Sequence, residues 1–384
     1  MKILISTGIF LPDIGGPATY IERLAKEFQT RGIKTKVICY SDVKKYGNYA
    51  FPVIRISRKY PKIIRHFLYF WSLLKLAKDI NIIYSQNTVS AGFPSILVSK
   101  ILGRKMVLKI VGDCAWESAR SKWGVVDEIE KFQKKKYNQK IENLRRIQRF
   151  VAQNANKIIT PSEYLKNIIL NWGIPEEKIR VIYNAVEKPF DSNILKEEAK
   201  KKIGIGGDII LSVGRLAPWK GFSTLINLFP DLIKRNPNFC LVIIGEGPEK
   251  ENLKSEIKSL KLENKIRLMG KVAHPQIGLY YKAADIFVLN SGYEGLSHVI
   301  LEAMQYNIPI IASNKGGNPE LIQNDINGFL VEYDNREEIK SAILRLWQDK
   351  NLQERFIKNS QEKLKEFNWK NLVEKTLEVL KTTV

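Results

Sequence analysis

The chain has 384 residues, 44% of them hydrophobic, which excludes a disordered or fibrous protein and is too long for one ordinary core. Its net charge of +22 lies mostly in the first half: residues 1–190 hold 34 basic and 15 acidic residues, a net +19, and residues 191–384 hold 28 and 25, a net +3. No apolar run approaches the roughly 18 residues of a spanning helix, and three widely spaced cysteines without metal-ligand spacing indicate a reducing, cytoplasmic compartment.

Short β-branched runs alternate with amphipathic stretches through most of the chain, a pattern typical of parallel sheets covered by helices. In the first half a helix is predicted at 17–31, and strands are predicted at 2–6, 35–40, 80–85, 105–111, 157–160 and 180–183. A second series of strands is predicted at 209–213, 240–244, 266–269, 286–289 and 309–312. The sequence therefore predicts two doubly wound domains, whose ligands bind beyond the carboxyl ends of the strands. Their boundary is expected near residue 187, where Pro189 and Asp191 interrupt the pattern.

A glycine-bearing loop at residues 7–17 follows the first predicted strand and leads into the first helix. Gly15 and Gly16 would let the backbone approach a ligand, and the free amides of the helix would face an anion. The spacing is not that of the dinucleotide fingerprint, so a tight strand-to-helix turn is the alternative.

The start of the second series repeats this arrangement with two cations. Arg215 and Lys220 lie five positions apart between a strand and a helix, where a guanidinium and an ammonium suit the two phosphates of a pyrophosphate. Gly214 precedes them, and the next strand ends in a second close-approach loop that holds Glu246 and Gly247. Solvated surface cations and a plain turn are the alternatives at these two loops.

Two acidic residues, Glu294 and Glu302, follow the strand predicted at 286–289. Helical geometry places Glu294 just before a helix and Glu302 about two turns later on roughly the same face, so that both carboxylates could address one ligand. At the amino end of that helix a phosphate could be held by the amides of Gly295, Leu296 and Ser297. Helix capping is the alternative for Glu294, whereas Glu302 lies among apolar residues.

These motifs resemble those of glycosyltransferase family four, whose members have the GT-B fold, and the resemblance covers essentially the whole chain. It rests on the two glutamates together with Gly316, Gly317 and the run at 327–331. It implies an α/β protein with two Rossmann-like domains facing across a cleft: an acceptor domain at 1–187, a donor domain at 188–365, and a helix at 366–384 that crosses back onto the first domain.

The resemblance also implies a retaining, metal-independent hexosyltransferase that needs no cofactor. By position, Arg215 and Lys220 would bind the donor diphosphate, Glu294 the donor sugar, and Glu302 the ribose of a UDP- or GDP-linked sugar. A GT-B sugar-nucleotide epimerase, which would need no acceptor, is the nearest enzymatic alternative.

On the acceptor side the resemblance implies that domain closure brings Gly15 and Gly16 against the donor phosphate. Family members often carry a histidine after a middle strand of the acceptor domain, and here Asp113 stands in the matching stretch. We expect Asp113 to be a ligand of the sugar or the acceptor, with a turn cap as the alternative.

Two basic stretches of the first domain, residues 55–71 and 131–149, set cations beside aromatic or apolar residues. Such a stretch could dock as an amphipathic helix on the anionic inner face of the cytoplasmic membrane. The alternative is a helix that packs its apolar face on the sheet and keeps a solvated lysine face. With the resemblance, this charge favours a glycan or lipid-linked acceptor in cell-envelope glycan synthesis. A non-enzymatic basic protein that binds membrane or nucleic acid is the remaining alternative, and nucleic acid is the less favoured partner.

Overall fold

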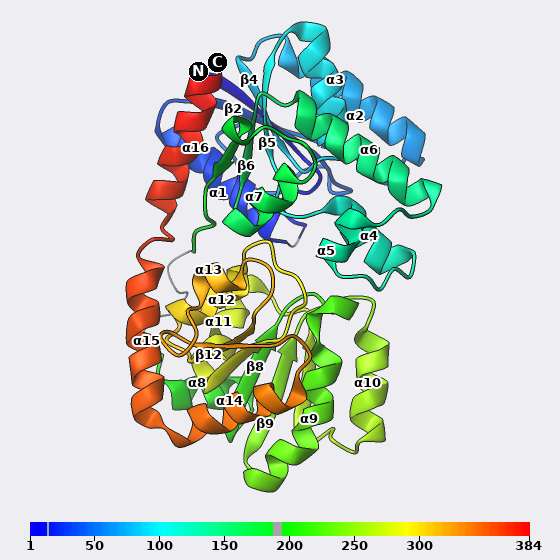
Figure 1. The fold of residues 1–384 in the computed structure, drawn as a ribbon. Coiled ribbons are helices and arrows are strands. Elements are labelled where there is room, and N and C mark those ends of the chain that lie inside the picture. The colour runs from blue at the N-terminus through cyan, green and yellow to red at the C-terminus, as the bar shows by residue number, and fades with distance from the viewer. Residues whose placement is uncertain (14, 187–193) are drawn as a thin grey trace. The chain divides into compact units, whose positions relative to one another are not determined.

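The computed structural model describes residues 1–13, 15–186 and 194–384, which form two compact units (Figure 1). The first unit contains Met1–Tyr183 and Lys370–Val384, and the second contains Asn184–Trp369. The boundary expected near residue 187, with Pro189 and Asp191, falls outside the described residues. Contacts divide the chain between Tyr183 and Asn184, and most of helix α16, Trp369–Thr383, belongs to the first unit.

The first unit is built on a parallel sheet whose described strands have the order β3-β2-β1-β4-β5-β6-β7. These strands are β1 (Lys2–Thr7), β2 (Lys34–Tyr40), β3 (Val53–Ile56), β4 (Ile82–Gln86), β5 (Lys105–Lys109), β6 (Lys157–Thr160) and β7 (Ile179–Val181). The chain runs outward from β1 to β3 and then returns to the other side of β1. The strand order therefore reverses between β1 and β4.

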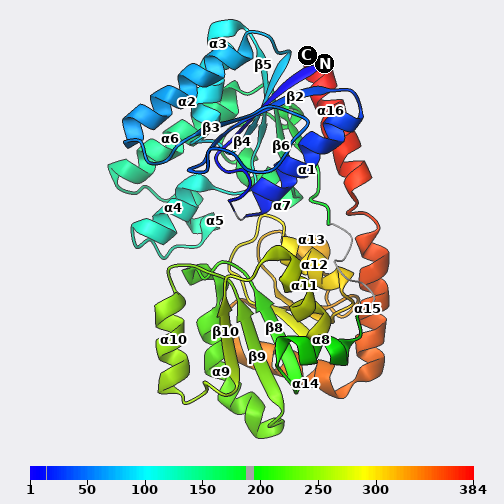
Figure 2. The ribbon, with the colours of Figure 1, turned by 180° about the vertical axis from the view of Figure 1, so that it is seen from behind.

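Helices cover both faces of this sheet, as expected for parallel strands that are buried on both sides. In the two views α2, α3 and α6 lie on one face, and α1 lies with α16 on the other (Figures 1 and 2). The helices of this unit, besides α16, are α1 (Gly16–Thr30), α2 (Lys62–Ala77), α3 (Gly92–Leu102), α4 (Cys114–Lys122), α5 (Ile129–Lys134), α6 (Gln139–Asn154) and α7 (Glu163–Leu170).

The second unit repeats this plan with described strands in the order β10-β9-β8-β11-β12-β13, all parallel. Its strands are β8 (Asp208–Val213), β9 (Phe239–Ile244), β10 (Ile266–Gly270), β11 (Ile286–Leu289), β12 (Ile310–Ser313) and β13 (Phe329–Val331). Its helices are α8 (Lys196–Ile203), α9 (Phe222–Arg235), α10 (Lys250–Ser259), α11 (His274–Ala283), α12 (His298–Gln305), α13 (Asn318–Leu321), α14 (Arg336–Gln348) and α15 (Lys350–Leu364). Here the order reverses between β8 and β11.

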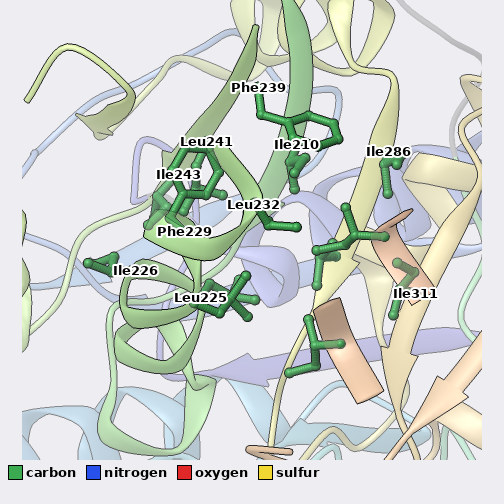
Figure 3. Packing of buried hydrophobic residues seen from close by; sticks show 14 of the residues in the cluster. Ile210, Leu225, Ile226, Phe229, Leu232, Phe239, Leu241, Ile243, Ile286 and Ile311 are labelled. Atoms are coloured by element: carbon green, nitrogen blue, oxygen red, sulfur yellow. The ribbon is translucent and has the colours of Figure 1, made fainter. Parts of the chain in front are cut away.

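The core of the second unit lies between its strands and the helices α9 and α14 (Figure 3). All six residues of β9 are buried, because helices cover the sheet on both faces. From α9 the side chains of Leu225, Phe229 and Leu232 enter the same cluster. Burial of each such side chain contributes about 1.5–3 kcal/mol to the hydrophobic free energy of folding, and this rigid support positions the loops at the sheet edge.

The predicted strands are all present, with ends shifted by at most two residues. Two of the described strands, β3 and β13, were not predicted: β3 overlaps the stretch interpreted as basic at 55–71, and β13 lies within the motif at 327–331. None of the helices in the described part of the chain combines the length and the apolar character that crossing a bilayer requires.

Candidate functional site

Two loops meet at the carboxyl edge of the second sheet, where the strand order reverses. One loop follows β8 and runs from Gly214 to Gly221, and the other follows β11 and runs from Asn290 to Ser297. The Gly292 amide donates to the carbonyl of Trp219 at 2.7 Å, which joins the two loops directly. In open parallel sheets, ligands bind beyond the carboxyl ends of the two strands that flank such a reversal.

Lys220 and Glu294 form an ion pair across these two loops, Nζ donating to Oε1. The two side chains are only 14% and 13% exposed, so water screens the pair weakly. Oε2 of Glu294 has no hydrogen-bond partner among the described residues. The sequence placed these residues in one site, and the structure brings their charged atoms together.

Arg215, by contrast, is exposed, and its guanidinium has no hydrogen-bond or ion-pair partner in the described part of the chain. The sequence assigned both Arg215 and Lys220 to the donor phosphates, but the structure gives the two side chains different surroundings. The charge of Lys220 is already balanced by Glu294, whereas the full positive charge of Arg215 is available to an anion.

The helix after β11 begins later than the sequence suggested. Its first residue is His298, and its cap is Ser297, whose Oγ accepts from the Ile300 amide at 3.3 Å. Glu294 therefore lies ahead of the helix, as expected, but three residues separate it from His298, so helical geometry does not set its position relative to Glu302. Ser297 uses its side chain as a cap, and Leu296 is buried. The amides that the helix itself presents first belong to residues 298 and 299.

Glu302 lies within α12 and accepts a hydrogen bond at Oε2 from the Tyr281 hydroxyl of α11, at 2.7 Å. Burial, and next to it the charge of Glu302, raise the pKa of Tyr281 well above its ordinary value. Tyr281 therefore stays a donor at neutral pH and holds the carboxylate of Glu302 in one orientation.

Gly316 and Gly317, after β12, lie against the backbone of the Glu294 loop. The Gly317 amide donates to the Glu294 carbonyl at 2.8 Å. A Cβ on Gly316 would lie 2.3 Å from that carbonyl oxygen, and one on Gly317 would lie 2.5 Å from the carbonyl oxygen of Gly295. The two glycines, which the sequence identified only as part of the motif, fix the position of Glu294 from a third strand.

The loop after β9 contains Glu246 and Gly247. Oε1 of Glu246 pairs with Lys250 at 2.8 Å, and Lys250 lowers the pKa of this 45% exposed carboxyl. A Cβ on Gly247 would lie 2.2 Å from the carbonyl oxygen of Leu216. Packing of this loop against the loop after β8 thus accounts for the glycine, where the sequence suggested a close approach to a ligand.

Asn290 is a residue whose role the sequence did not reveal. Its buried side-chain amide donates to the Gly221 carbonyl at 3.1 Å and to Asp334 Oδ1 at 2.9 Å, and its Oδ1 accepts from the Asp334 amide at 3.0 Å. Asp334 follows β13, so Asn290 joins the loops after three strands. In the sequence, this role was indicated only by the position of Asn290 directly after a buried strand.

A hollow of about 470 Å³ lies at the opposite, amino edge of the second sheet, lined by residues that include Lys201, Gly204 and Asn238. It is wide open to solvent, and its other lysine, Lys200, is paired with Asp285. We place the functional site at the carboxyl edge because the convergent charges and the strand reversal are there.

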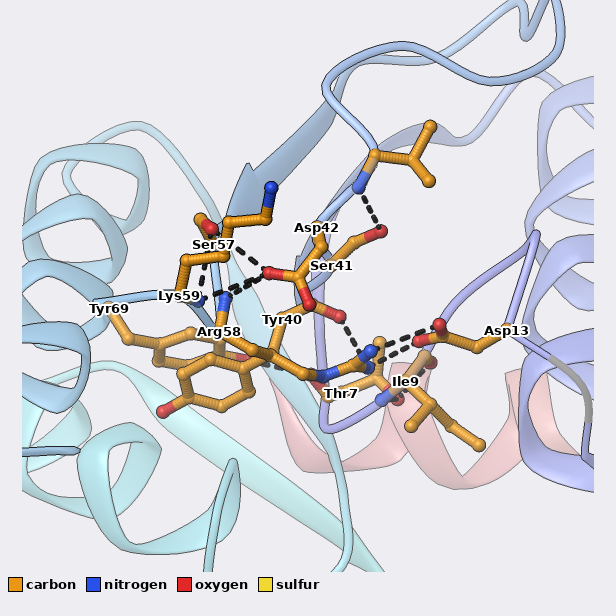
Figure 4. Close-up of polar contacts among 11 residues, drawn as sticks. Thr7, Ile9, Asp13, Tyr40, Ser41, Asp42, Ser57, Arg58, Lys59 and Tyr69 are labelled. Carbon is orange, nitrogen blue, oxygen red and sulfur yellow. Dashed lines mark hydrogen bonds and ion pairs between the residues drawn. The ribbon is translucent and has the colours of Figure 1, made fainter. Parts of the chain in front are cut away.

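In the first unit the loop after β1 is tied to the loop after β3 (Figure 4). Asp13 and Arg58 form a two-pronged ion pair, and Arg58 also donates to the Tyr40 carbonyl at 2.8 Å. Gly15 is the N-cap residue of α1, and Gly16 is the first residue of the helix. The predicted strand-to-helix loop is present, and the Asp13–Arg58 pair that anchors it was not foreseen.

Asp113 is 1% exposed and caps α4, the alternative that the sequence left open. Its Oδ1 accepts from the amides of Ala115 and Trp116 at 2.9 and 3.0 Å. The side chains of Gln133 and Gln148 donate to Oδ2 and Oδ1 at 2.7 and 3.1 Å. Both oxygens thus accept hydrogen bonds from the protein and the side chain is 1% exposed, so we correct its interpretation from a direct ligand to a residue that positions the loop after β5.

Lys109 ends β5 with a fully buried amine. Its Nζ has no hydrogen-bond partner in the described part of the chain and lies 3.6 Å from the centre of the Tyr20 ring. Burial lowers the pKa of Lys109 from 10.5 to about 7. In the unfolded chain this lysine keeps its proton up to its ordinary pKa, so between about pH 7 and 10.5 the unfolded state binds more protons and stability rises with pH.

Replacement of Lys109 with methionine is therefore expected to raise the free energy of unfolding at pH 7 and below by a few kcal/mol, and to flatten the rise above about pH 7. Urea unfolding on both sides of pH 7 measures this effect. Lys105→Met, at an exposed position of the same strand, is the control and should change neither quantity. A Lys109→Met protein with unchanged stability at every pH would contradict this account of the buried amine.

Two family models together match most of the chain. Residues 14–188 match the model described as Glycosyltransferase Family 4, and residues 195–363 match the model described as Glycosyl transferases group 1.

Individual relatives agree with these matches. An uncharacterized glycosyltransferase of Methanocaldococcus jannaschii is 33% identical over 233 residues, which are 59% of this chain and 60% of that protein. The alpha-monoglucosyldiacylglycerol synthase of Streptococcus pneumoniae is 26% identical over 360 residues, 90% of this chain and 78% of that protein. The crystal structure of Anabaena HepE in complex with UDP-glucose has a TM-score of 0.80 at 20% identity and covers 100% of both chains.

Proposed function

Because the chain belongs to glycosyltransferase family 4 and has the two Rossmann-like domains of the GT-B fold, we propose that its second unit binds a nucleotide sugar and that the enzyme transfers this sugar to a lipid-linked or otherwise anionic acceptor. The observation that carries the proposal is the pairing of Lys220 with Glu294 at the strand reversal, beside Arg215, which has no partner among the residues that the structure describes. HepE, of the same fold, binds UDP-glucose, and a UDP- or GDP-linked sugar is the donor class that we propose here.

In the proposed complex each charged group meets one part of the donor. Arg215 and the amino end of α12 face the diphosphate, and Lys220, held by Glu294, adds a second cation. Oε2 of Glu294 accepts from a sugar hydroxyl, and Glu302, oriented by Tyr281, accepts from the ribose.

We propose that transfer retains the configuration at the anomeric carbon. The acceptor hydroxyl attacks that carbon on the face from which the diphosphate leaves, the bond from carbon to the phosphate oxygen breaks, and the leaving phosphate takes the hydroxyl proton. The negative charge that develops on the diphosphate is stabilised by Arg215 and by the amides at the start of α12. NMR of the product during turnover would identify the anomer, and an inverted product would refute this step.

The same cations are proposed to do the work that a divalent ion does in other transferases, so no metal ion and no cofactor are required. Transfer in an excess of EDTA is expected to keep its full rate. A rate that falls in EDTA and returns with Mg²⁺ or Mn²⁺ would refute metal independence and leave donor binding untouched.

For the acceptor we propose a lipid-linked or anionic glycan of the cell envelope, met at the inner face of the cytoplasmic membrane by the basic first unit. Two observations support this proposal. Residues 1–190 carry a net charge of +19, from 34 basic and 15 acidic residues, and the relative from Streptococcus pneumoniae is named for the synthesis of a glucosylated diacylglycerol. A cationic surface attracts an anionic leaflet.

A panel of nucleotide sugars in a thermal unfolding assay tests the donor proposal. A ligand present at about 100 times its Kd stabilises the folded protein by about 2.7 kcal/mol, so UDP-glucose, GDP-mannose and their relatives should separate clearly. We expect one class to raise the Tm of the protein and to have little effect on Glu294→Gln. If no nucleotide sugar shifts the Tm, the donor proposal is wrong.

Gly214 offers a test of how closely the donor approaches the backbone. A Cβ there would lie 3.7 Å from Phe222 and 4.0 Å from Lys220, which are ordinary contacts, so Gly214→Ala should change the free energy of unfolding by less than about 1 kcal/mol. A diphosphate held against this backbone would meet the methyl group, and donor affinity should fall about tenfold.

Isothermal titration with the donor measures this change. Gly206→Ala is the matched control, because a Cβ on Gly206 meets nothing within 4 Å and the residue lies at the amino edge of the sheet. Equal affinity in Gly214→Ala and the parent protein would show that the donor does not approach Gly214.

A further inference from the structure

Helix α2 already buries one complete apolar face against the first sheet. Tyr69, Leu73 and Ala77 are buried, and the Tyr69 hydroxyl lies 2.8 Å from Ser6 Oγ and donates to the carbonyl oxygens of Thr7 and Ile38, each at 3.2 Å. Packing in the first unit therefore explains why this face of α2 is apolar. It does not explain the residues on the opposite face of the helix.

The opposite side of α2 is also apolar, although it faces solvent. Ile63 is 84% exposed, Ile64 48%, Phe67 58% and Trp71 48%. Their spacing of three or four residues puts them on one stripe, about 12 Å long from Ile63 to Trp71. The rings of Phe67 and Trp71 lie 6.0 Å apart. We call these four residues the α2 stripe.

Cations predominate around the α2 stripe. Residues 43–78 contain nine basic and no acidic residues, and the nearest acidic residues in the sequence, Asp42 and Asp79, lie at the two ends of this segment. Lys62 is exposed at the start of α2, Lys75 is exposed in its last turn, and Lys59 and Lys78 are exposed just outside its ends. An apolar stripe with a strongly basic border is complementary to an anionic lipid surface, where cations meet phosphates and apolar side chains enter the acyl boundary.

From this geometry we propose that the α2 stripe inserts into the interfacial region of an anionic phospholipid bilayer, with Phe67 and Trp71 as its anchors. The inference rests on the proposed membrane contact of the first unit and names the residues that make it. The stripe lies on the convex outer face of a helix, so it can enter the soft boundary of a bilayer. Insertion to about 5–10 Å would bury the apolar area that folding leaves exposed.

The test uses the full-length protein and cosedimentation with vesicles of phosphatidylcholine containing about 30% phosphatidylglycerol, with pure phosphatidylcholine in parallel. The protein should partition onto the anionic vesicles. The double variant Phe67→Ser/Trp71→Ser should lower the partition coefficient at least about tenfold, because each ring loses its transfer into the interface. Val126→Ser removes an 80% exposed apolar side chain of the same unit outside α2, and it should bind as the parent does.

Brominated lipids report insertion directly, because bromine quenches the fluorescence of a tryptophan that enters the acyl boundary. Trp71→Phe keeps an apolar ring and six of the seven tryptophans. It should therefore still bind vesicles but lose most of the quenching. The thermal shift by nucleotide sugar should be the same in all these variants, because the donor site lies in the second unit.

Three results would overturn the proposal. One is a parent protein that does not partition onto anionic vesicles, and another is a Phe67→Ser/Trp71→Ser protein that binds them unchanged. The third is a concentration-dependent dimer, in the absence of lipid, that the double variant dissolves, since the stripe would then contact a second copy of the chain. Vesicle binding by a protein that binds no nucleotide sugar would instead refute the proposed function and leave this inference standing.

Discussion

Arg215→Ala is expected to lower kcat/KM for the nucleotide sugar about 100-fold or more while leaving the free energy of unfolding unchanged. The guanidinium is exposed and has no partner among the described residues, so the fold loses no contact when it is removed. The reaction loses a cation next to the departing diphosphate, where negative charge increases as the bond to the sugar breaks. Release of UDP or GDP by the purified protein, in the presence or absence of an acceptor, measures the effect.

The matched control is Arg235→Ala. Arg235 is exposed in the last turn of α9, at the end of the helix opposite the loop that carries Arg215. Arg235→Ala removes one positive charge, as Arg215→Ala does, so a general electrostatic effect would lower the activity of both variants alike. Full activity in Arg215→Ala would remove Arg215 from the site. A large loss of stability in this variant would show that its side chain has a structural role.

Gly316→Ala is expected to cost about 3 kcal/mol or more in the free energy of unfolding and to lower activity about 100-fold. Two separate effects add at this position. Gly316 has a φ of +62°, where a side chain is strained, and its Cβ would lie 2.3 Å from the carbonyl oxygen and 2.7 Å from the amide nitrogen of Glu294. The loop would have to move, and the carboxylate would move with it.

Gly204→Ala separates these two effects. Gly204 has a φ of +68°, but a Cβ there meets nothing within 4 Å. It should therefore show the backbone strain alone, about 1 kcal/mol, with normal activity. Urea unfolding and donor turnover of the two variants give the comparison. Equal stability losses in both would contradict the packing of Gly316 on the Glu294 loop.

The sequence was sufficient to predict two doubly wound units and the strands that carry the site, because long β-branched runs separated by helical periodicity leave few other folds. It also placed Lys220 and Glu294 in one site, since both follow strands of the same predicted sheet. It did not reveal that they pair. That contact depends on β11 lying beside β8, and strand order is set by packing between residues far apart in the chain.

The start of α12 shows a different kind of error. Ser297 directly precedes an apolar helical run, which is a start signal for a helix, and its hydroxyl caps that helix. The prediction assigned a phosphate to the amides of Gly295, Leu296 and Ser297 and began the helix directly after Glu294, although the cap signal at Ser297 begins it at His298. Asp113 shows the same ambiguity at α4, since one carboxylate can be a cap or a ligand until its donors are known.

For helix α2 the solvent exposure of the side chains distinguishes two faces that the sequence pattern does not. Its sequence is apolar on both sides, so periodicity alone is compatible with a helix packed on the sheet and with one that docks on a membrane. The structure shows that Leu73 enters the core while Phe67 remains 58% exposed. One face of the helix therefore packs on the sheet as expected, and the opposite face stays accessible for the membrane contact that we propose. The strand β13 was missed because its residues were interpreted only as part of the motif at 327–331, and the contact from Asn290 to Asp334 was missed with it.

Hydrogen exchange with and without UDP tests the central claim most directly, because it locates the bound nucleotide on the chain. The account predicts that UDP slows exchange in residues 214–221 and 290–300, the loops after β8 and β11 with the start of α12, and leaves the hollow at the amino edge of the second sheet unchanged. Protection confined to that hollow, or protection nowhere in the second unit at saturating UDP, would contradict it.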